Sequence, residues 1–141
     1  MTVRTLRELM TQKVITCLAE DNLLTAHTLM RQHGFRHIPV VDRHQAYLGV
    51  VTQKDVLREA FLIVEKSGAQ ALSAREEKML IRDVMSQDIL PVSADMTLLE
   101  AGKFFVERKH GCLPVVENGK LIGIVTSADF VKLCVAFLAQ G

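Results

Sequence analysis

The sequence of 141 residues is poor in several features that would place it quickly in a functional class. It contains no tryptophan and one tyrosine, aromatic residues make up 5% of it, and its net charge is only +1. Proteins that bind nucleic acid need a basic surface, and those that bind single strands also stack bases on aromatic side chains. The composition therefore argues against a nucleic-acid reader, and the balanced charge argues against electrostatic attachment to a membrane.

Cysteine and long apolar runs are also scarce. Lys132 interrupts the most apolar stretch, so we expect no membrane span, and the charged first ten residues are unlike a signal peptide. The cysteines are odd in number and irregular in spacing, which fits neither a disulfide framework nor a zinc site. The three cysteines are Cys17, Cys112 and Cys134. We therefore expect a soluble protein of the reducing cytosol.

Side chains that could carry catalysis do not form a recognisable set. No Ser/His/Asp or Cys/His arrangement and no recurrent pair of carboxylates is found, so we expect no enzyme. His33 and His37 are four residues apart, but Gly34 would end the helix that could place them on one face, and we expect no metal site. Cys112 could sense redox state, although a buried thiol more often acts as a small apolar residue.

A duplication is the strongest signal in the sequence. Residues 6–42 match residues 81–117 at a constant offset of 75, so that Met10 corresponds to Met85. After a change of one residue in a loop, the match resumes at an offset of 74, with Thr52 corresponding to Thr126. A length change confined to a turn is what a duplicated fold tolerates.

Each copy predicts the order β-α-β-β-α. Capping signals at Asn22 and at Thr97 with Glu100 begin the first helices. Asn118-Gly119 predicts a tight hairpin, and Ser73 with Glu76 predicts a capped linker helix. We expect extended pieces at 14–16 and 89–92, strands at 37–41, 47–51, 112–116 and 121–125, and second helices from about 53 and 127.

These elements predict a mixed α+β fold with the two copies packed about a pseudo-twofold axis. A copy of about 60 residues would bury too little surface to be stable alone, so the copies are expected to share one core. The predicted organisation is motif 1 at residues 1–66, a linker with a short helix at 67–80, and motif 2 at 81–141.

Two closing motifs point to a known family. Gly49-Val50-Val51-Thr52-Gln53-Lys54-Asp55 and Gly123-Ile124-Val125-Thr126-Ser127-Ala128-Asp129 each lead from a strand into a helix. With the Met10 and Met85 starts and the strand prolines Pro39 and Pro114, they resemble the CBS domain, named for cystathionine β-synthase. The resemblance covers nearly the whole chain. It implies a tandem pair with clefts between the copies for AMP, ADP, ATP or S-adenosylmethionine.

The residues agree with a nucleotide. A strand that runs straight into a helix offers free backbone N–H groups and the positive end of the helix dipole to a phosphate. An ionised carboxylate only accepts hydrogen bonds, so it suits ribose hydroxyls instead. The expected ribose ligands are Asp55 and Asp129; the expected phosphate ligands are Thr52, Thr126, Lys54, Arg58 and Ser127; the expected adenine pocket comprises Val14, Ile15, Ile38, Pro39, Val51, Ile89, Leu90, Leu113, Pro114 and Val125.

The two sites are not expected to be equal. Lys54 and Arg58 add charge after Thr52, which favours a longer polyphosphate at the Asp55 site. Thr-x-x-Asp before a helix is also an ordinary N-terminal cap, worth about 1 kcal/mol and needing no ligand. A module that binds no ligand and serves only dimerisation or scaffolding is therefore the alternative.

Association with other chains is expected on two grounds. Residues 130–138 are apolar on nearly every helical face, and residues 61–64 repeat the pattern. This pattern predicts a homodimer that forms through these two helices. The resemblance to the CBS domain implies the same, because such pairs commonly dimerise through these helices. We expect no attached catalytic, channel or transporter domain, so a regulatory signal would have to reach a separate, unidentified protein; the alternative is that the protein buffers the nucleotide.

Overall fold

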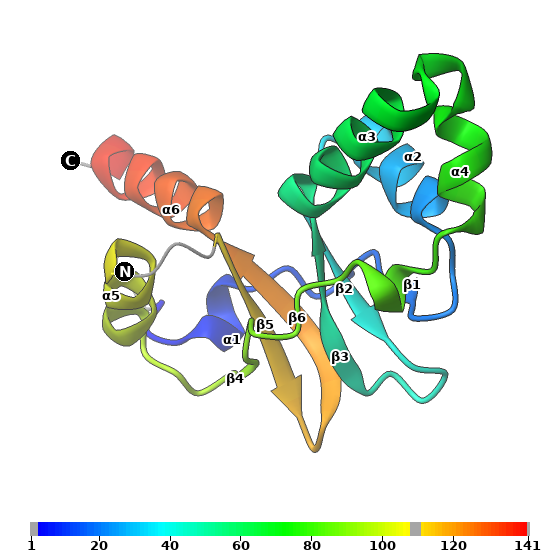
Figure 1. Cartoon of the computed structure of the whole chain (residues 1–141). Coiled ribbons are helices and arrows are strands. Elements are labelled where there is room, and N and C mark those ends of the chain that lie inside the picture. The colour runs from blue at the N-terminus through cyan, green and yellow to red at the C-terminus, as the bar shows by residue number, and fades with distance from the viewer. Residues whose placement is uncertain (1–2, 108–110, 141) are drawn as a thin grey trace. The chain divides into compact units, whose positions relative to one another are not determined.

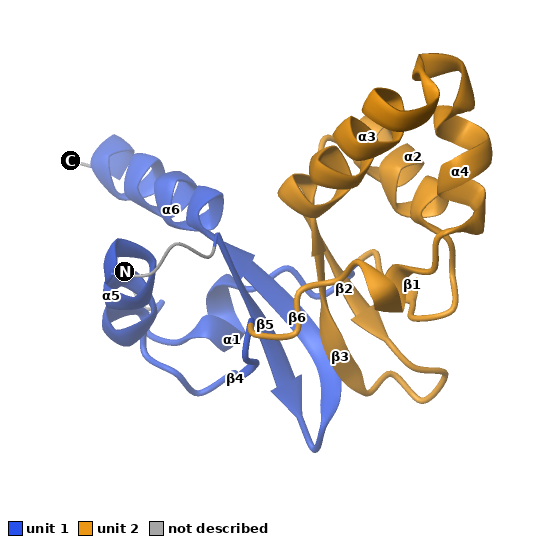
Figure 2. Ribbon diagram, in the orientation of Figure 1, with its two compact units in different colours: residues 1–14, 89–141 blue, residues 15–88 orange. Residues whose placement is uncertain are grey.

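The computed structural model describes residues 3–107 and 111–140, shown in Figure 1. The chain divides into two compact units, coloured separately in Figure 2. Unit 1 comprises residues 1–14 and 89–141, and unit 2 comprises residues 15–88. Each unit thus combines the body of one repeat with the opening segment of the other.

Unit 2 contains a three-stranded sheet in the order β1-β2-β3 with helices packed on it. β1 pairs with β2 in parallel, and β2 pairs with β3 in an antiparallel hairpin. The hairpin loop is held by the Asp42 carboxylate, whose pKa is lowered by hydrogen bonds from the backbone of Ala46 and His44. The elements are β1 (Cys17–Leu18), α2 (Leu23–His33), β2 (His37–Val41), β3 (Tyr47–Thr52), α3 (Gln53–Ser67) and α4 (Leu72–Lys78), with 3₁₀ turns at Ala69–Ala71 and Ile81–Asp83.

Unit 1 repeats this topology. Its sheet has the order β4-β5-β6, again with one parallel pair followed by an antiparallel hairpin. Both hairpins carry an irregularity at corresponding places, Val40/Val41 and Val115/Val116. The elements are α1 (Leu6–Leu9), β4 (Val92–Ser93), α5 (Leu98–Glu107), β5 (Cys112–Glu117), β6 (Lys120–Thr126) and α6 (Ser127–Gln140). The mixed α+β fold with two β-α-β-β-α motifs is confirmed.

Local signals in the sequence mark many of the element ends. The Asn22 side chain accepts from the Thr25 N–H at 3.0 Å, and Gly34 ends the same helix with φ of 72°. In the other repeat, Thr97 and Glu100 form the expected reciprocal contacts. Asn118 and the following glycine both have positive φ, as a tight hairpin turn requires.

Three expected boundaries were wrong. The first strands begin later than predicted, at Cys17 and Val92, because parallel pairing with the hairpin selects those residues. Ser73 does not cap the linker helix, since α4 begins at Leu72 after a 3₁₀ turn and its N-cap makes no side-chain hydrogen bond. A tertiary contact holds this helix instead: buried Glu76 lies 2.9 and 3.0 Å from Nδ1 of His27 on α2.

Each unit has its own apolar core. In unit 2 the core lies between the sheet and α2, and it includes the fully buried Leu23, Ile38 and Val51. In unit 1 the fully buried core includes Ala101, Leu113 and Val125, with three phenylalanines packed at the edge. The strand residues in these sets alternate with residues on the opposite face, as a sheet with one face on the core requires.

The opening segments of the repeats complete the opposite cores. Leu6 is fully buried in unit 1, and its N–H donates to the carbonyl of Met96 at 3.0 Å. The corresponding Ile81 is fully buried in unit 2, and its N–H donates to the carbonyl of Asp21 at 2.8 Å. The chain therefore exchanges its two opening segments between the units.

Two glycines permit this exchange. Gly49 on β3 lies under Met85 and Ser86, and an added Cβ would stand 2.7 Å from the carbonyl oxygen of Ser86. Gly123 on β6 lies in the same way under Met10, where an added Cβ would stand 2.5 Å from its sulfur. Next to each glycine the crossing segment forms a pair of backbone hydrogen bonds with the strand, at 2.8–3.0 Å between Val50 and Ser86.

We predict that Gly49→Ala lowers the free energy of unfolding by about 1–3 kcal/mol, because the methyl group overlaps a backbone oxygen that cannot move freely. The control is Gly102→Ala in α5, where the added Cβ meets only Phe130 at 3.7 Å. Removing a helix-interior glycine there should raise stability by about 0.5–1 kcal/mol. Urea denaturation followed by circular dichroism measures both, and equal stability of the two variants would contradict the prediction.

Candidate functional site

The predicted site residues centre on the two places where a hairpin strand runs into a helix. β3 passes into α3 at Thr52, and β6 passes into α6 at Thr126. At each junction the threonine is the last strand residue, and the aspartate three positions later lies in the first helical turn. Each junction therefore gathers a hydroxyl, a carboxylate and the free N–H groups of a helix start.

At the first junction the aspartate is fully engaged by the protein. Asp55 is only 4% exposed. Its Oδ2 accepts from the Thr52 N–H at 2.9 Å, and its own N–H donates to Thr52 Oγ1 at 3.1 Å, which completes a capping box. Arg58 donates to Oδ1 at 3.1 Å, and the hydroxyl of Ser86 lies 3.3 Å from Oδ1 and 3.1 Å from Oδ2.

At the second junction the aspartate is more open. Asp129 is half-buried, and its Oδ2 accepts from the Thr126 N–H at 2.8 Å and more weakly from the Thr126 hydroxyl at 3.4 Å. Among the described residues, no hydrogen bond reaches Oδ1 of this carboxylate. Within residues 3–107 and 111–140, Asp129 thus keeps Oδ1 free of protein hydrogen bonds, whereas both oxygens of Asp55 are contacted.

The expected phosphate ligands surround the same helix starts. Thr52 and Thr126 are half-buried, while Lys54 and Ser127 are exposed on the first turns of α3 and α6. The Arg58 side chain is 57% exposed but forms an ion pair with Asp55. That contact uses one terminal nitrogen of the guanidinium, so Arg58 would reach a phosphate either with its other N–H groups or after leaving the carboxylate.

The expected adenine pocket is less uniform. Four of its members, Ile38, Val51, Leu113 and Val125, have no exposed surface and belong to the two cores. Pro39, Pro114 and Ile89 are buried as well. The members that offer surface for contact with a base are the half-buried Val14 and Ile15 and the exposed Leu90.

Sequence reasoning missed the role of Ser86. The residue was visible only as the counterpart of Thr11 in the duplication, and nothing in that match shows which side chain it would contact. The crossing segment places it against Asp55, because backbone hydrogen bonds to Val50 fix its position. A contact made by the exchanged segment could not be read from the spacing within one repeat.

Other candidate chemistry is absent from the described part of the chain. No group of three or more His, Cys, Asp or Glu side chains that could hold a metal ion occurs in residues 3–107 and 111–140. Burial raises the pKa of the Cys112 thiol to about 12, so this cysteine is held in its unreactive protonated form. Burial raises the pKa of Cys17 to about 12 in the same way. Within the same residues, every helix is too short or too polar to cross a bilayer.

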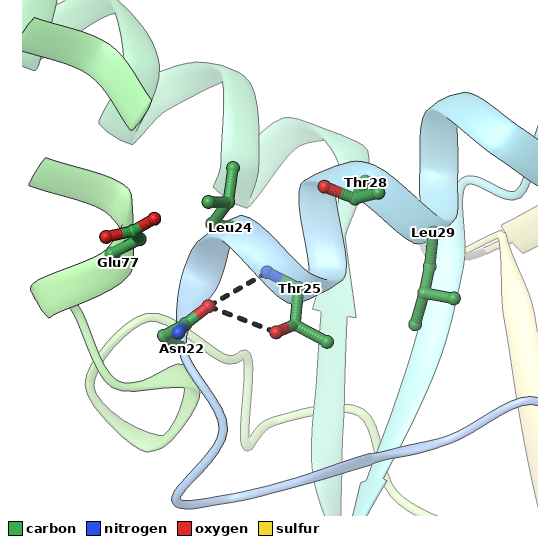
Figure 3. Close-up of a pocket in the computed structure, with 6 residues that line it drawn as sticks. All are labelled: Asn22, Leu24, Thr25, Thr28, Leu29 and Glu77. Carbon is green, nitrogen blue, oxygen red and sulfur yellow. Dashed lines mark hydrogen bonds between the residues drawn. The ribbon is translucent and has the colours of Figure 1, made fainter. Parts of the chain in front are cut away.

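A hollow of about 490 Å³ lies at the start of α2 and is shown in Figure 3. The amide oxygen of Asn22 points to the helix start there and accepts from both N and Oγ1 of Thr25, at 3.0 and 3.1 Å. Because the cap already uses that oxygen, the hollow offers a ligand little specific recognition. Its lining residues are Asn22, Leu24, Thr25, Thr28, Leu29 and Glu77.

The chain is similar to several solved structures over nearly its full length. One, described as an acetoin utilization protein (AcuB) from Vibrio cholerae, is 31% identical with a TM-score of 0.80 and is matched over 97% of this chain and 94% of that one. CBSX2 from Arabidopsis thaliana, described as a CBS-pair protein, is 26% identical with a TM-score of 0.82, over 99% of this chain and 100% of that one. CBSX2 has also been solved in complex with AMP, again at 26% identity.

Among curated sequences, an uncharacterised protein of Methanopyrus kandleri is 32% identical over 127 residues. The match covers 89% of this chain and 60% of that protein, and the next two relatives are matched over 21% and 32% of their lengths. The family model described as "CBS domain" matches residues 6–61 and again residues 81–136. Since these two matches span most of the sequence and coincide with the two repeats, the chain belongs to the CBS domain family as a tandem pair.

Proposed function

We propose that the chain is a regulatory module that binds an adenosine-containing ligand at its strand–helix junctions and signals to a separate protein. The observation that carries this proposal is the Thr126–Asp129 junction, where a half-buried carboxylate, one of whose oxygens no described residue hydrogen-bonds, lies beside the start of α6. That pair of groups matches a nucleotide, because the carboxylate suits the ribose hydroxyls and the helix start suits a phosphate.

AMP is the first ligand to test. CBSX2, which shares the fold at 26% identity, has been solved with AMP. At the second junction, Thr126 and Ser127 would face the phosphate and Asp129 the ribose. At the first, Thr52 and Lys54 would face the phosphate and Asp55 the ribose, with Arg58 joining them after it leaves Asp55. ADP, ATP and S-adenosylmethionine share the adenosine part and are the other candidates.

We predict that a bound nucleotide raises the melting temperature of the protein. At a hundredfold excess over Kd, a ligand that binds only the folded state stabilises it by about 2.7 kcal/mol, which corresponds to a shift of roughly 5–10 °C. Differential scanning fluorimetry with AMP, ADP, ATP and S-adenosylmethionine measures this, with GMP and inorganic phosphate as controls. If no member of the panel shifts the transition at millimolar concentration, the alternative of a scaffold without ligand is favoured.

The module is also proposed to act as a homodimer. On α3, Leu57, Phe61 and Val64 occupy one helical face and are 55%, 70% and 40% exposed. Their counterparts on α6, at an offset of 74 residues, are Val131, Val135 and Leu138, which are 63%, 62% and 71% exposed. The same exposed apolar stripe thus occurs in both repeats, and water-exposed stripes of this kind mark association surfaces.

We predict that Phe61→Asp and Val135→Asp each convert a dimer to a monomer, because a charge in the centre of a stripe would have to be buried. Multi-angle light scattering at micromolar concentration measures the mass. Lys66→Asp is the control, because it places a new carboxylate on the same helix away from the stripe. A wild-type protein with the mass of one chain would refute the dimer.

A further inference from the structure

The two strand–helix junctions match in sequence but differ in how the protein uses their aspartates. The difference bears on ligand binding only if the proposed function holds, because both carboxylates are candidate ribose ligands. A ribose presents two neighbouring hydroxyl donors, and a carboxylate has about four lone-pair positions to accept hydrogen bonds. A carboxylate can therefore bind the sugar only if the protein leaves some of those positions free.

At Asp55 three protein donors occupy the two oxygens, and the Ser86 hydroxyl lies between both. Oδ1 is contacted by Arg58 and by the Ser86 hydroxyl, and Oδ2 by the Thr52 N–H and by the same hydroxyl. The side chain of this aspartate is 5% exposed. A ribose hydroxyl approaching Asp55 would have to displace at least one of these donors.

At Asp129 the matching donors are not engaged. Lys132 corresponds to Arg58 and Thr11 to Ser86. Thr11 is anchored as firmly as Ser86, with backbone hydrogen bonds of 3.0 and 3.1 Å to Ile124, yet it is exposed. Across the part of the chain that the structure describes, neither Thr11 nor Lys132 forms a hydrogen bond or ion pair with Asp129, and the residue is half-buried, whereas Asp55 is buried.

We propose that the Asp129 junction is the working nucleotide site and that the Asp55 junction is latent, closed by Ser86 and Arg58. The two closing residues differ in character. Arg58 is mostly exposed and can swing away, whereas Ser86 is held by hydrogen bonds of 2.8 and 3.0 Å to Val50 and keeps its hydroxyl on the carboxylate. Ser86 is therefore the residue that sets the number of nucleotides bound by each chain.

Isothermal titration calorimetry with AMP tests this proposal. We expect the wild type to bind one AMP per chain and Asp129→Asn to lose that binding by at least tenfold. Ser86→Ala should add a second binding event, because it removes the fixed donor from Asp55 and leaves Arg58, which can swing away. Arg58→Ala should keep a single event, because the Ser86 hydroxyl remains on the carboxylate. The control is Thr11→Ala, the same kind of change at the matched position, which should keep one event of unchanged affinity.

NMR supports the assignment without any substitution. In the wild type, AMP should shift the amide signals of Thr126, Ser127 and Asp129 and leave those of Thr52 and Asp55 unmoved. Two equal binding events in the wild type, shifts at both junctions, a single event in the Ser86→Ala protein or a second event in the Arg58→Ala protein would overturn the inference while leaving the proposed function intact. An absence of AMP binding to the wild type would instead sink the proposed function itself.

Discussion

The close approach of a crossing segment to the last strand of each sheet is the contact on which the rest of the structure depends. Gly49 and Gly123 lack the Cβ that would collide with it, so Ser86 and Thr11 can pair through the backbone with the strand residues Val50 and Ile124. This pairing brings Leu6 of the first repeat into the core of unit 1, which is built mainly from the second repeat. Ile81 of the second repeat likewise enters the core of unit 2, which is built mainly from the first. In unit 2 it also delivers the Ser86 side chain to the strand–helix junction.

Much of the fold could be predicted because its signals are local. Hairpins, capping residues and helix starts depend on a few neighbouring residues, and the duplication allowed each to be checked against its copy; Asn22 and Thr97 are examples. The first strands were misplaced because parallel pairing is decided by distant partners such as Val40 for Cys17. The linker helix was capped wrongly because its stability comes from Glu76 and His27, which are far apart in sequence.

In the candidate site too, the features set by neighbouring residues could be predicted and those set by distant residues could not. The threonine and aspartate of each junction follow from spacing alone, and the structure places them together. Which strand residues retain surface does not follow from spacing, because burial of Ile38 or Leu113 depends on everything packed against it. The difference between Asp55 and Asp129 arises from Ser86 and Arg58 taken together, so it becomes visible only when contacts from three segments are known.

The exchange of opening segments has a consequence for how the protein can be divided into fragments that fold. A gene cut at the border between the two repeats would encode halves that each carry the wrong opening segment for their own sheet. Residues 15–88, by contrast, contain a sheet, its helices and the crossing segment that pairs with its last strand. A fragment with a complete core therefore begins inside the first repeat, whereas a cut between the repeats leaves each sheet without the segment that pairs with its last strand.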